Sequence, residues 1–101
     1  MSNHWLYEVT AEFDDSALAA AWAEWMQNEH IADVVKAGAL NGRLLRPAEN
    51  SSTFIAQYEF ASESALKTYL ETQSPRLRTE AANRFDPARI KYTRRTAEII
   101  S

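Results

Sequence analysis

His30 is the side chain of this sequence best suited to proton transfer near neutral pH, and it is the candidate catalytic residue. An imidazole has a reference pKa of about 6.5. Glu29 precedes it and Asp33 follows one helical turn later, so either carboxylate could orient the ring. The alternative is that His30 caps a helix or packs at its end. His4 is the only other histidine and the chain has no cysteine, so disulfides and thiolate nucleophiles are excluded and no metal site is expected.

Aromatic side chains are the second group that could form a site. A wall of aromatic rings with a few hydroxyl groups suits a small planar organic ligand. The alternative is that these rings only fill the core, where buried tyrosine hydroxyls need hydrogen-bond partners. Together with His30, the candidate ligand-binding residues are Tyr7, Trp22, Trp25, Tyr58 and Tyr69.

Arginines form the third group, because a guanidinium binds a carboxylate or phosphate through two parallel hydrogen bonds. The candidates for anion binding are Arg43, Arg76, Arg94 and Arg95, with Gln57 as a further polar group. Basic residues are concentrated in 76–95, whereas acidic residues outnumber basic ones in 1–50. The alternative is therefore ion pairing within the fold or across a dimer interface.

Composition narrows the classes of function. The net charge of -3 at pH 7 argues against nucleic acid as a partner. The chain has two glycines and no glycine-rich phosphate loop, which excludes most nucleotide-binding motifs. No cofactor is expected.

The elements that would position these residues follow from hydrophobic periodicity. Apolar and polar residues alternate from Trp5 to Phe13, which predicts a strand with one buried face. A helix is expected from Ser16, capped by the oxygens of the preceding aspartates. Its apolar residues, Trp22 and Trp25 among them, fall at spacings of three and four. The spacing changes phase near 28–30, so we expect the helix to weaken there, before a short turn through 31–37 that Gly38 closes.

The second half predicts a hairpin, two helical segments and a last strand. The hairpin strands are expected over 40–46 and 53–60, around a polar turn. Ser62 caps a helix, and Ser74-Pro75 restarts it, because proline is favoured at the first helical position. The last strand is expected over 90–100, with a bulge near Arg94 and Arg95 where the apolar residues change parity.

These elements follow the order βαββαβ in one α+β domain, residues 1–101. Right-handed crossovers place the first strand in the centre of a four-stranded antiparallel sheet, with the helices on one face. The other face is expected to be polar, with Glu8 and Glu12 beside the arginines of the last strand. Water or a second copy would cover it. No secretory signal or membrane-spanning run is recognisable, which makes the cytoplasm the default compartment.

Five stretches of the sequence resemble a bacterial family known as a domain of unknown function. They are EHIADV at 29–34, FIAQYE at 54–59, YLE at 69–71 with PRLR at 75–78, and YTRR at 92–95. The family is similar to the dimeric α/β-barrel superfamily, and proline is usual in it where Ala32 stands here. The resemblance spans residues 5–98. It implies a ferredoxin-like protomer and a homodimer whose sheets pack face to face.

The superfamily includes cofactor-free monooxygenases, haem-degrading enzymes and muconolactone isomerases, but none of their catalytic patterns can be laid on this sequence. We therefore expect a small cytoplasmic homodimer, associated through the open sheet face, with a cavity for a small organic molecule between sheet and helices. The alternative is a cofactor-independent enzyme of the dimeric α/β-barrel type, monooxygenase- or isomerase-like, with His30 as acid/base and an arginine holding an anionic substrate. A third hypothesis is that 76–95 binds an anionic macromolecule.

Overall fold

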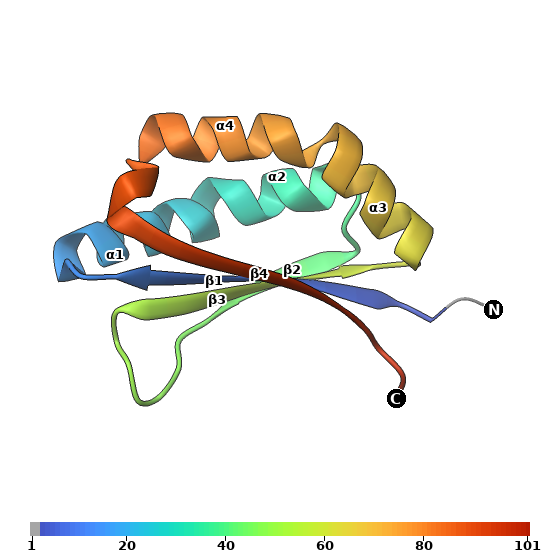
Figure 1. Cartoon of the computed structure of the whole chain (residues 1–101), viewed down its shortest axis with the longest axis horizontal. Helices are drawn as coiled ribbons and strands as arrows, with labels where there is room; N and C mark the ends of the chain where they lie inside the picture. Colours follow the sequence, from blue (N-terminus) through green and yellow to red (C-terminus); the bar gives the residue numbers. More distant parts are fainter. Residues whose placement is uncertain (1–2) are drawn as a thin grey trace.

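The computed structural model describes residues 3–101 and has two layers, a four-stranded sheet and a layer of helices on one of its faces (Figure 1). All neighbouring strands are antiparallel, in the order β2-β3-β1-β4. The strands are β1 (Trp5–Phe13), β2 (Asn41–Leu45), β3 (Thr53–Phe60) and β4 (Ile90–Glu98). The predicted ferredoxin-like α+β fold, with β1 inside the sheet, is confirmed.

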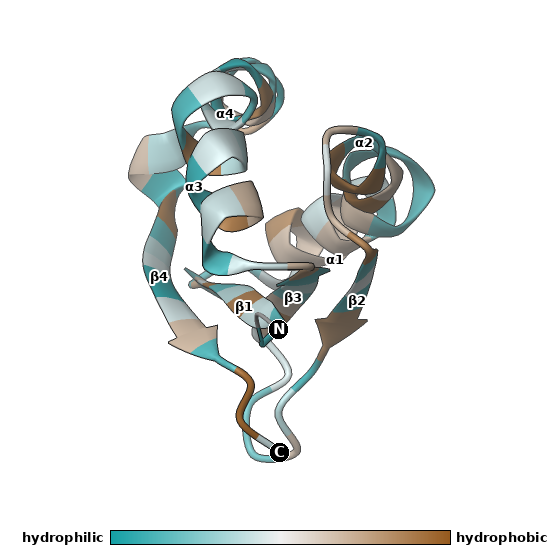
Figure 2. Ribbon diagram, turned by 90° about the vertical axis from the view of Figure 1, so that its right-hand side faces the viewer, coloured by the Kyte–Doolittle hydropathy of each residue, from teal (hydrophilic) through white to brown (hydrophobic). Residues whose placement is uncertain are grey.

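The helices form two rods above the sheet. The first rod contains α1 (Ser16–Trp25), the π-helical segment η1 (Met26–His30) and α2 (Ile31–Lys36), and the second contains α3 (Glu63–Thr72) and α4 (Ser74–Arg84). A 3-10 turn, η2 (Pro87–Arg89), leads into β4. Figure 2 looks along the sheet and shows α3 and α4 above the β4 side and α1 and α2 above the β2 side.

Both predicted helix starts are capped as expected. The side chain of Asp15 accepts hydrogen bonds from the backbone N–H groups of Ala17 and Leu18, at 2.9 and 3.2 Å. The Ser62 hydroxyl accepts one from the N–H of Ala65 at 3.0 Å. These caps satisfy N–H groups that have no partner within the helix.

The expected weakening of the first helix is a π-helical segment. The N–H of Ile31 bonds to the carbonyl of Met26, five residues back, so one turn holds an additional residue. This turn rotates the apolar stripe, so that Trp22 before it, Met26 at its start and Val34 after it are all buried. Gly38 follows α2 with φ +139°, a conformation that residues with a Cβ rarely adopt.

The bulge predicted in the last strand is wrong. β4 pairs with β1 residue for residue, from Ile90 opposite Phe13 to Glu98 opposite Trp5. Directly opposed residues share a face, so Arg94 lies on the helix side and Arg95 on the open side. The change of apolar parity has a simpler cause: β4 is an edge strand, and Ala97 lies on the open face without any shift of register.

The hydrophobic core lies between the two layers and is dominated by the side chains of Trp22 and Trp25, which are 2% and 8% exposed. Trp22 packs against Phe13 and Phe54 of the sheet, with ring centroids 5.3 and 6.0 Å apart. The tryptophan stripe therefore covers the sheet as its spacing predicted.

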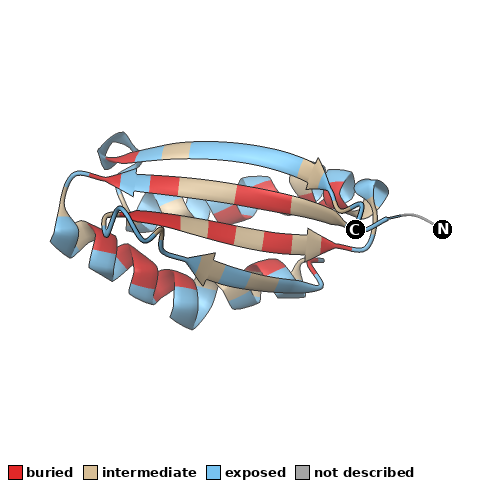
Figure 3. Ribbon diagram, turned by 90° about the horizontal axis from the view of Figure 1, so that it is seen from below, coloured by how far each residue is buried: buried red, intermediate tan, exposed pale blue. Residues whose placement is uncertain are grey.

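Figure 3 shows the open face of the sheet from below. One side chain from each strand contributes to a hydrogen-bonded row on this face. Arg43 Nε donates to Gln57 Oε1 at 2.8 Å, and Gln57 Nε2 donates to Glu8 Oε2 at 2.8 Å. Arg95 Nε donates to the other oxygen, Glu8 Oε1, at 2.9 Å. We call these four residues the polar row. Glu8 is only 9% exposed, because its neighbours in the row cover it.

None of the helices in residues 3–101 is both long and apolar enough to cross a membrane.

Candidate functional site

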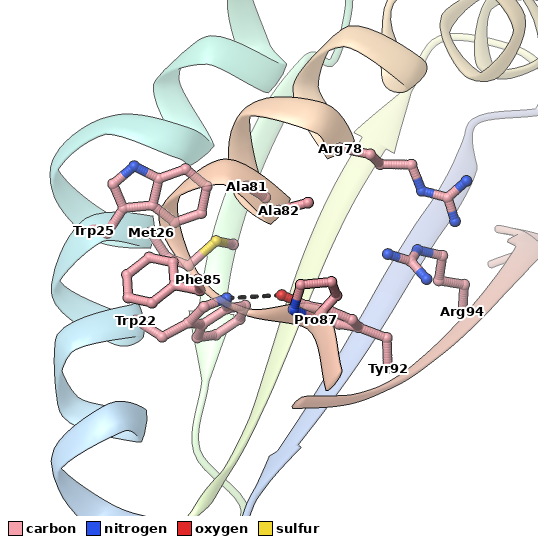
Figure 4. A pocket seen from close by; sticks show the side chains of 10 residues that line it. All are labelled: Trp22, Trp25, Met26, Arg78, Ala81, Ala82, Phe85, Pro87, Tyr92 and Arg94. Carbon is pink, nitrogen blue, oxygen red and sulfur yellow. Dashed lines mark hydrogen bonds between the residues drawn. The ribbon is translucent and has the colours of Figure 1, made fainter. Parts of the chain in front are cut away.

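A pocket of about 300 Å³ opens between α1, α4 and β4 (Figure 4). Four aromatic side chains form most of its wall: Trp22 and Trp25 from α1, Phe85 from the end of α4, and Tyr92 from β4. Two arginines, Arg78 and Arg94, stand at one end of the pocket. We call this pocket the aromatic lobe.

The wall of the aromatic lobe is held by contacts between the elements that form it. Trp25 packs against Phe85 with ring centroids 5.5 Å apart, which joins α1 to the end of α4. Trp22 Nε1 donates a hydrogen bond of 3.1 Å to the hydroxyl of Tyr92, which joins α1 to β4. The Arg94 guanidinium lies 4.8 Å from the centroid of the Tyr92 ring, within the range of a cation–π contact.

Tyr92 has a hydroxyl hydrogen to offer to a ligand. Partial burial raises the pKa of Tyr92 above its usual value, so the hydroxyl is protonated at neutral pH. Its oxygen accepts from Trp22, and within residues 3–101 no acceptor receives its own hydrogen. A carbonyl or phenolic oxygen bound in the aromatic lobe could accept that hydrogen bond.

A second pocket, of about 410 Å³, continues beyond the arginines. Its wall includes hydroxyl-bearing side chains from three elements, Tyr7 of β1, Ser74 of α4 and Thr96 of β4. Arg78 and Arg94 line both pockets. The two pockets therefore form one groove, in which an aromatic lobe and a polar lobe meet at two guanidinium groups.

The structure brings five of the predicted site residues to this groove. Trp22 and Trp25 line the aromatic lobe, Tyr7 lines the polar lobe, and Arg94 lines both. Arg95 also borders the polar lobe, although its guanidinium bonds to Glu8 on the open face of the sheet. The other lining residues, Phe85 and Tyr92 among them, are not among the predicted site residues.

Tyr58 and Tyr69 lie in the core and line neither lobe. Tyr58 stacks on Tyr7 with ring centroids 6.2 Å apart, and its hydroxyl is buried with no hydrogen-bond partner in the described chain. Burial raises the pKa of Tyr58 far above its usual value, and it raises the pKa of Tyr69 to about 12. Both hydroxyls are therefore neutral at physiological pH.

His30 reaches the aromatic lobe only through Trp25. Its ring stacks on Trp25 with centroids 4.7 Å apart, and His30 is not part of the wall of either lobe. Its Nδ1 is buried without a partner in residues 3–101. Burial lowers the pKa of His30, although the nearby carboxylates of Asp33 and Glu80 oppose this shift. The imidazole is therefore neutral at pH 7.

Two candidate arginines lie away from the groove. Arg43 belongs to the polar row on the open face. Arg76 lies on α4 and pairs with Glu80 at 3.3 Å, an exposed contact between residues four apart on one helix. The ion-pairing alternative describes Arg76 better than anion binding does.

Arg78 is a groove residue that was not among the predicted sites. It shares a stripe of α4 with Ala81, Ala82 and Phe85, at the spacings of three and four that mark one helix face. This spacing could have identified Arg78, because a basic residue on an otherwise apolar helix face lies at the edge of the surface that this face covers.

The part of the chain that the structure describes holds no group of three or more histidine, aspartate or glutamate residues that could bind a metal ion.

The fold and the groove together define a ferredoxin-like α+β protein with a small pocket between its sheet and its helices. The chain belongs to the family described as Domain of unknown function (DUF4286), whose model matches residues 4–99. Comparison with curated proteins gives no match.

Several solved structures share the fold at low sequence identity. A dimeric ferredoxin-like protein from an uncultured marine organism has a TM-score of 0.72 and 11% identity, with 99% of this chain and 98% of that one covered. SnoaB, a cofactor-independent oxygenase from Streptomyces nogalater, has a TM-score of 0.69 and 13% identity, with 99% and 96% covered. A protein of unknown function from Nitrosomonas europaea has a TM-score of 0.65 and 17% identity, with 100% and 94% covered.

Proposed function

We propose that the protein is a homodimer, formed through the open face of its sheet, and that each protomer binds a small planar organic molecule in the aromatic lobe. The observation that carries the binding role is the pocket lined by Trp22, Trp25, Phe85 and Tyr92. The cytoplasmic location expected from the sequence stays a prediction.

The chemistry of the open face supports the dimer. The charge of Glu8, at the centre of the face, is matched by Arg95 of the same protomer, so covering the face leaves no lone buried carboxylate. The neighbouring row of opposed residues carries no charge: Leu45, Ile55, Thr10 and Thr93. One of the similar structures is also described as dimeric.

Native mass spectrometry of gently purified protein tests the dimer and reports any co-purified ligand in the same experiment. We expect the mass of two chains at micromolar concentration. Ile55→Glu places an unpaired carboxylate in the uncharged row and is expected to give single chains. Ala20→Glu, at an exposed position of α1, is the matched control and should remain dimeric. Single chains for the unchanged protein would refute the proposed dimer.

The size and composition of the aromatic lobe support the binding role. A volume of about 300 Å³ is at the lower end of the range of small-molecule pockets, which are mostly apolar with a few placed polar groups. Here the polar groups are the Tyr92 hydroxyl and the two arginines at the end of the pocket. The aromatic faces favour stacking with a planar ligand.

The three tryptophans allow this role to be tested by NMR. Trp22 and Trp25 line the aromatic lobe, whereas Trp5 lies on β1 outside its wall. Titration with 2-naphthamide should shift the indole N–H signals of Trp22 and Trp25 and leave that of Trp5 in place. Ala82→Phe, at a lining position of α4, should abolish the shifts, while Asn83→Phe, one residue away and outside the wall, should retain them. Saturable shifts that persist in Ala82→Phe would refute the pocket.

The enzyme alternative, with His30 as acid/base, has less support from the geometry. One of the similar structures is described as a cofactor-independent oxygenase, but at 13% identity it speaks for the fold alone. His30 is neutral and able to accept a proton, yet Trp25 stands between it and the aromatic lobe. A general base must come within hydrogen-bond reach of the proton it removes. The observed arrangement therefore favours binding over proton transfer by His30.

A further inference from the structure

Most of the basic residues in the segment 76–95 are neutralised within the fold. Five of the seven basic residues have a carboxylate partner within 4.0 Å, and four of these carboxylates come from the acidic first half of the chain. The pairs are Arg76 with Glu80, Arg84 with Glu29, Arg89 with Asp15, Lys91 with Glu12, and Arg95 with Glu8. The ion-pairing alternative from the sequence is thus correct for these residues.

Arg78 and Arg94 are the exceptions in this segment. Neither has a carboxylate partner among residues 3–101. A missing partner is not informative by itself, since the exposed Lys36 also has none. The two arginines differ from Lys36 in that they come from different elements, α4 and β4, and point toward one another at the junction of the two lobes (Figure 4).

Two converging guanidinium groups repel one another and attract an anion. The contact with the Tyr92 ring holds Arg94 at the junction, so its position does not depend on a partner carboxylate. A carboxylate placed between the two groups would offset their repulsion and could accept paired hydrogen bonds from each planar fork.

We propose that the groove binds an aromatic carboxylate, with its ring in the aromatic lobe and its carboxylate between Arg78 and Arg94. This assignment rests on the proposed function, because it names the class of molecule for the same pocket. Thr96, an exposed residue of β4, lines the polar lobe beyond the arginines, and its hydroxyl can hydrogen-bond to a polar substituent of a longer ligand.

Comparison of two probes on the unchanged protein tests the assignment. 2-Naphthoate and 2-naphthamide have the same ring system and nearly the same shape, but only the first is charged. Calorimetric titration at neutral pH is expected to show about tenfold tighter binding of 2-naphthoate, because hydrogen bonds to a charged group are roughly twice as strong as those between neutral groups. Equal affinities would show that the groove does not recognise the carboxylate, and would still be consistent with binding in the aromatic lobe. If neither probe binds, the proposed function is wrong and this assignment falls with it.

Variants then locate the charge recognition. Arg78→Gln and Arg94→Gln should each weaken 2-naphthoate binding about tenfold while changing 2-naphthamide binding less than about twofold. Arg84→Gln is the matched control, since Arg84 also lies on α4 but pairs with Glu29 and lines neither lobe. Both arginines are exposed, so the variants are expected to fold. Equal losses for both probes, or a loss in Arg84→Gln as large as in the other two, would overturn the assignment.

Discussion

Replacement of Tyr58 by phenylalanine is expected to stabilise the protein, although Tyr58 is among its most buried residues. Tyr58 is 2% exposed, and its hydroxyl has no hydrogen-bond partner in residues 3–101. A buried polar group without a partner costs about 1–3 kcal/mol relative to its hydrated state in the unfolded chain. Tyr58→Phe removes this cost and keeps the ring that stacks on Tyr7.

The opposing effect is small. Loss of the oxygen leaves a void of roughly 10 Å³, which at about 24 cal/mol per Å³ costs about 0.2 kcal/mol. The net gain is therefore about 0.8–2.8 kcal/mol, and each kcal/mol raises the melting temperature of a domain of this size by about 4–8 °C. Urea unfolding, followed by far-ultraviolet circular dichroism, measures this change in the free energy of unfolding. All variants must be compared at one protein concentration, because the unfolding midpoint of the proposed dimer would depend on concentration.

Tyr92→Phe is the matched control, because it removes a hydroxyl that has a partner. The Tyr92 oxygen accepts from Trp22 Nε1 at 3.1 Å, and Trp22 is 2% exposed. Its loss leaves the indole N–H unpaired and should destabilise the protein by about 1 kcal/mol. The two substitutions are thus expected to have opposite signs. A lower urea midpoint for Tyr58→Phe would show that its hydroxyl is satisfied and that the reasoning from its burial is wrong.

Three further predictions concern packing and pH. Gly42→Ala should lower the free energy of unfolding by about 1–3 kcal/mol in the same urea assay, since a Cβ at Gly42 would lie 2.9 Å from the ring of Tyr58; an unchanged midpoint would contradict this packing. The hydrogen bond from the N–H of Leu18 and the contact with Arg89 hold the pKa of Asp15 below its ordinary 3.8. The ionised Asp15 therefore stabilises the fold above that pH, and this stabilisation is lost as the pH falls through the lowered pKa. Asp15→Asn keeps a capping side chain but cannot titrate, and its melting temperature should therefore fall less on acidification. Burial lowers the pKa of His30, so the unfolded chain takes up a proton more readily than the folded one, and stability should decline as the pH falls below about 6.5. The melting temperature of His30→Gln should decline less between pH 7 and 5. An identical pH profile for this variant and the unchanged protein would refute the role of His30.

The fold was largely predictable because local patterns and tertiary packing agree. The alternation from Trp5 to Phe13 corresponds to β1 over the same residues, and the tryptophan stripe of α1 packs on the sheet. The predicted bulge is wrong because it requires one face of β4 to carry all of its apolar residues. An edge strand is not under that constraint, and in β4 the helix side carries Arg94 while the open side carries Ala97.

The site was only partly predictable, because its residues are selected by the relative position of elements distant in the chain. Tyr7, Tyr58 and Tyr92 all lie on the helix side of the sheet, but only Tyr92 lines the aromatic lobe. What separates them is the strand order, since β4 is at the edge beneath α4 whereas β3 lies inside the sheet. His30 lines neither lobe, because it ends the π-helical turn and stacks on Trp25, as in the alternative that it packs at a helix end.

The polar row has a consequence for how the proposed association of two protomers should respond to ionic strength. Both oxygens of Glu8 are already engaged, one by Gln57 and the other by Arg95. A second copy that covers this face would find no free carboxylate at its centre, so we expect most of the attraction to come from removal of apolar and neutral surface from water. Added salt screens attraction between charges but leaves this contribution intact. The dissociation constant of the pair should accordingly stay nearly constant from low to high salt.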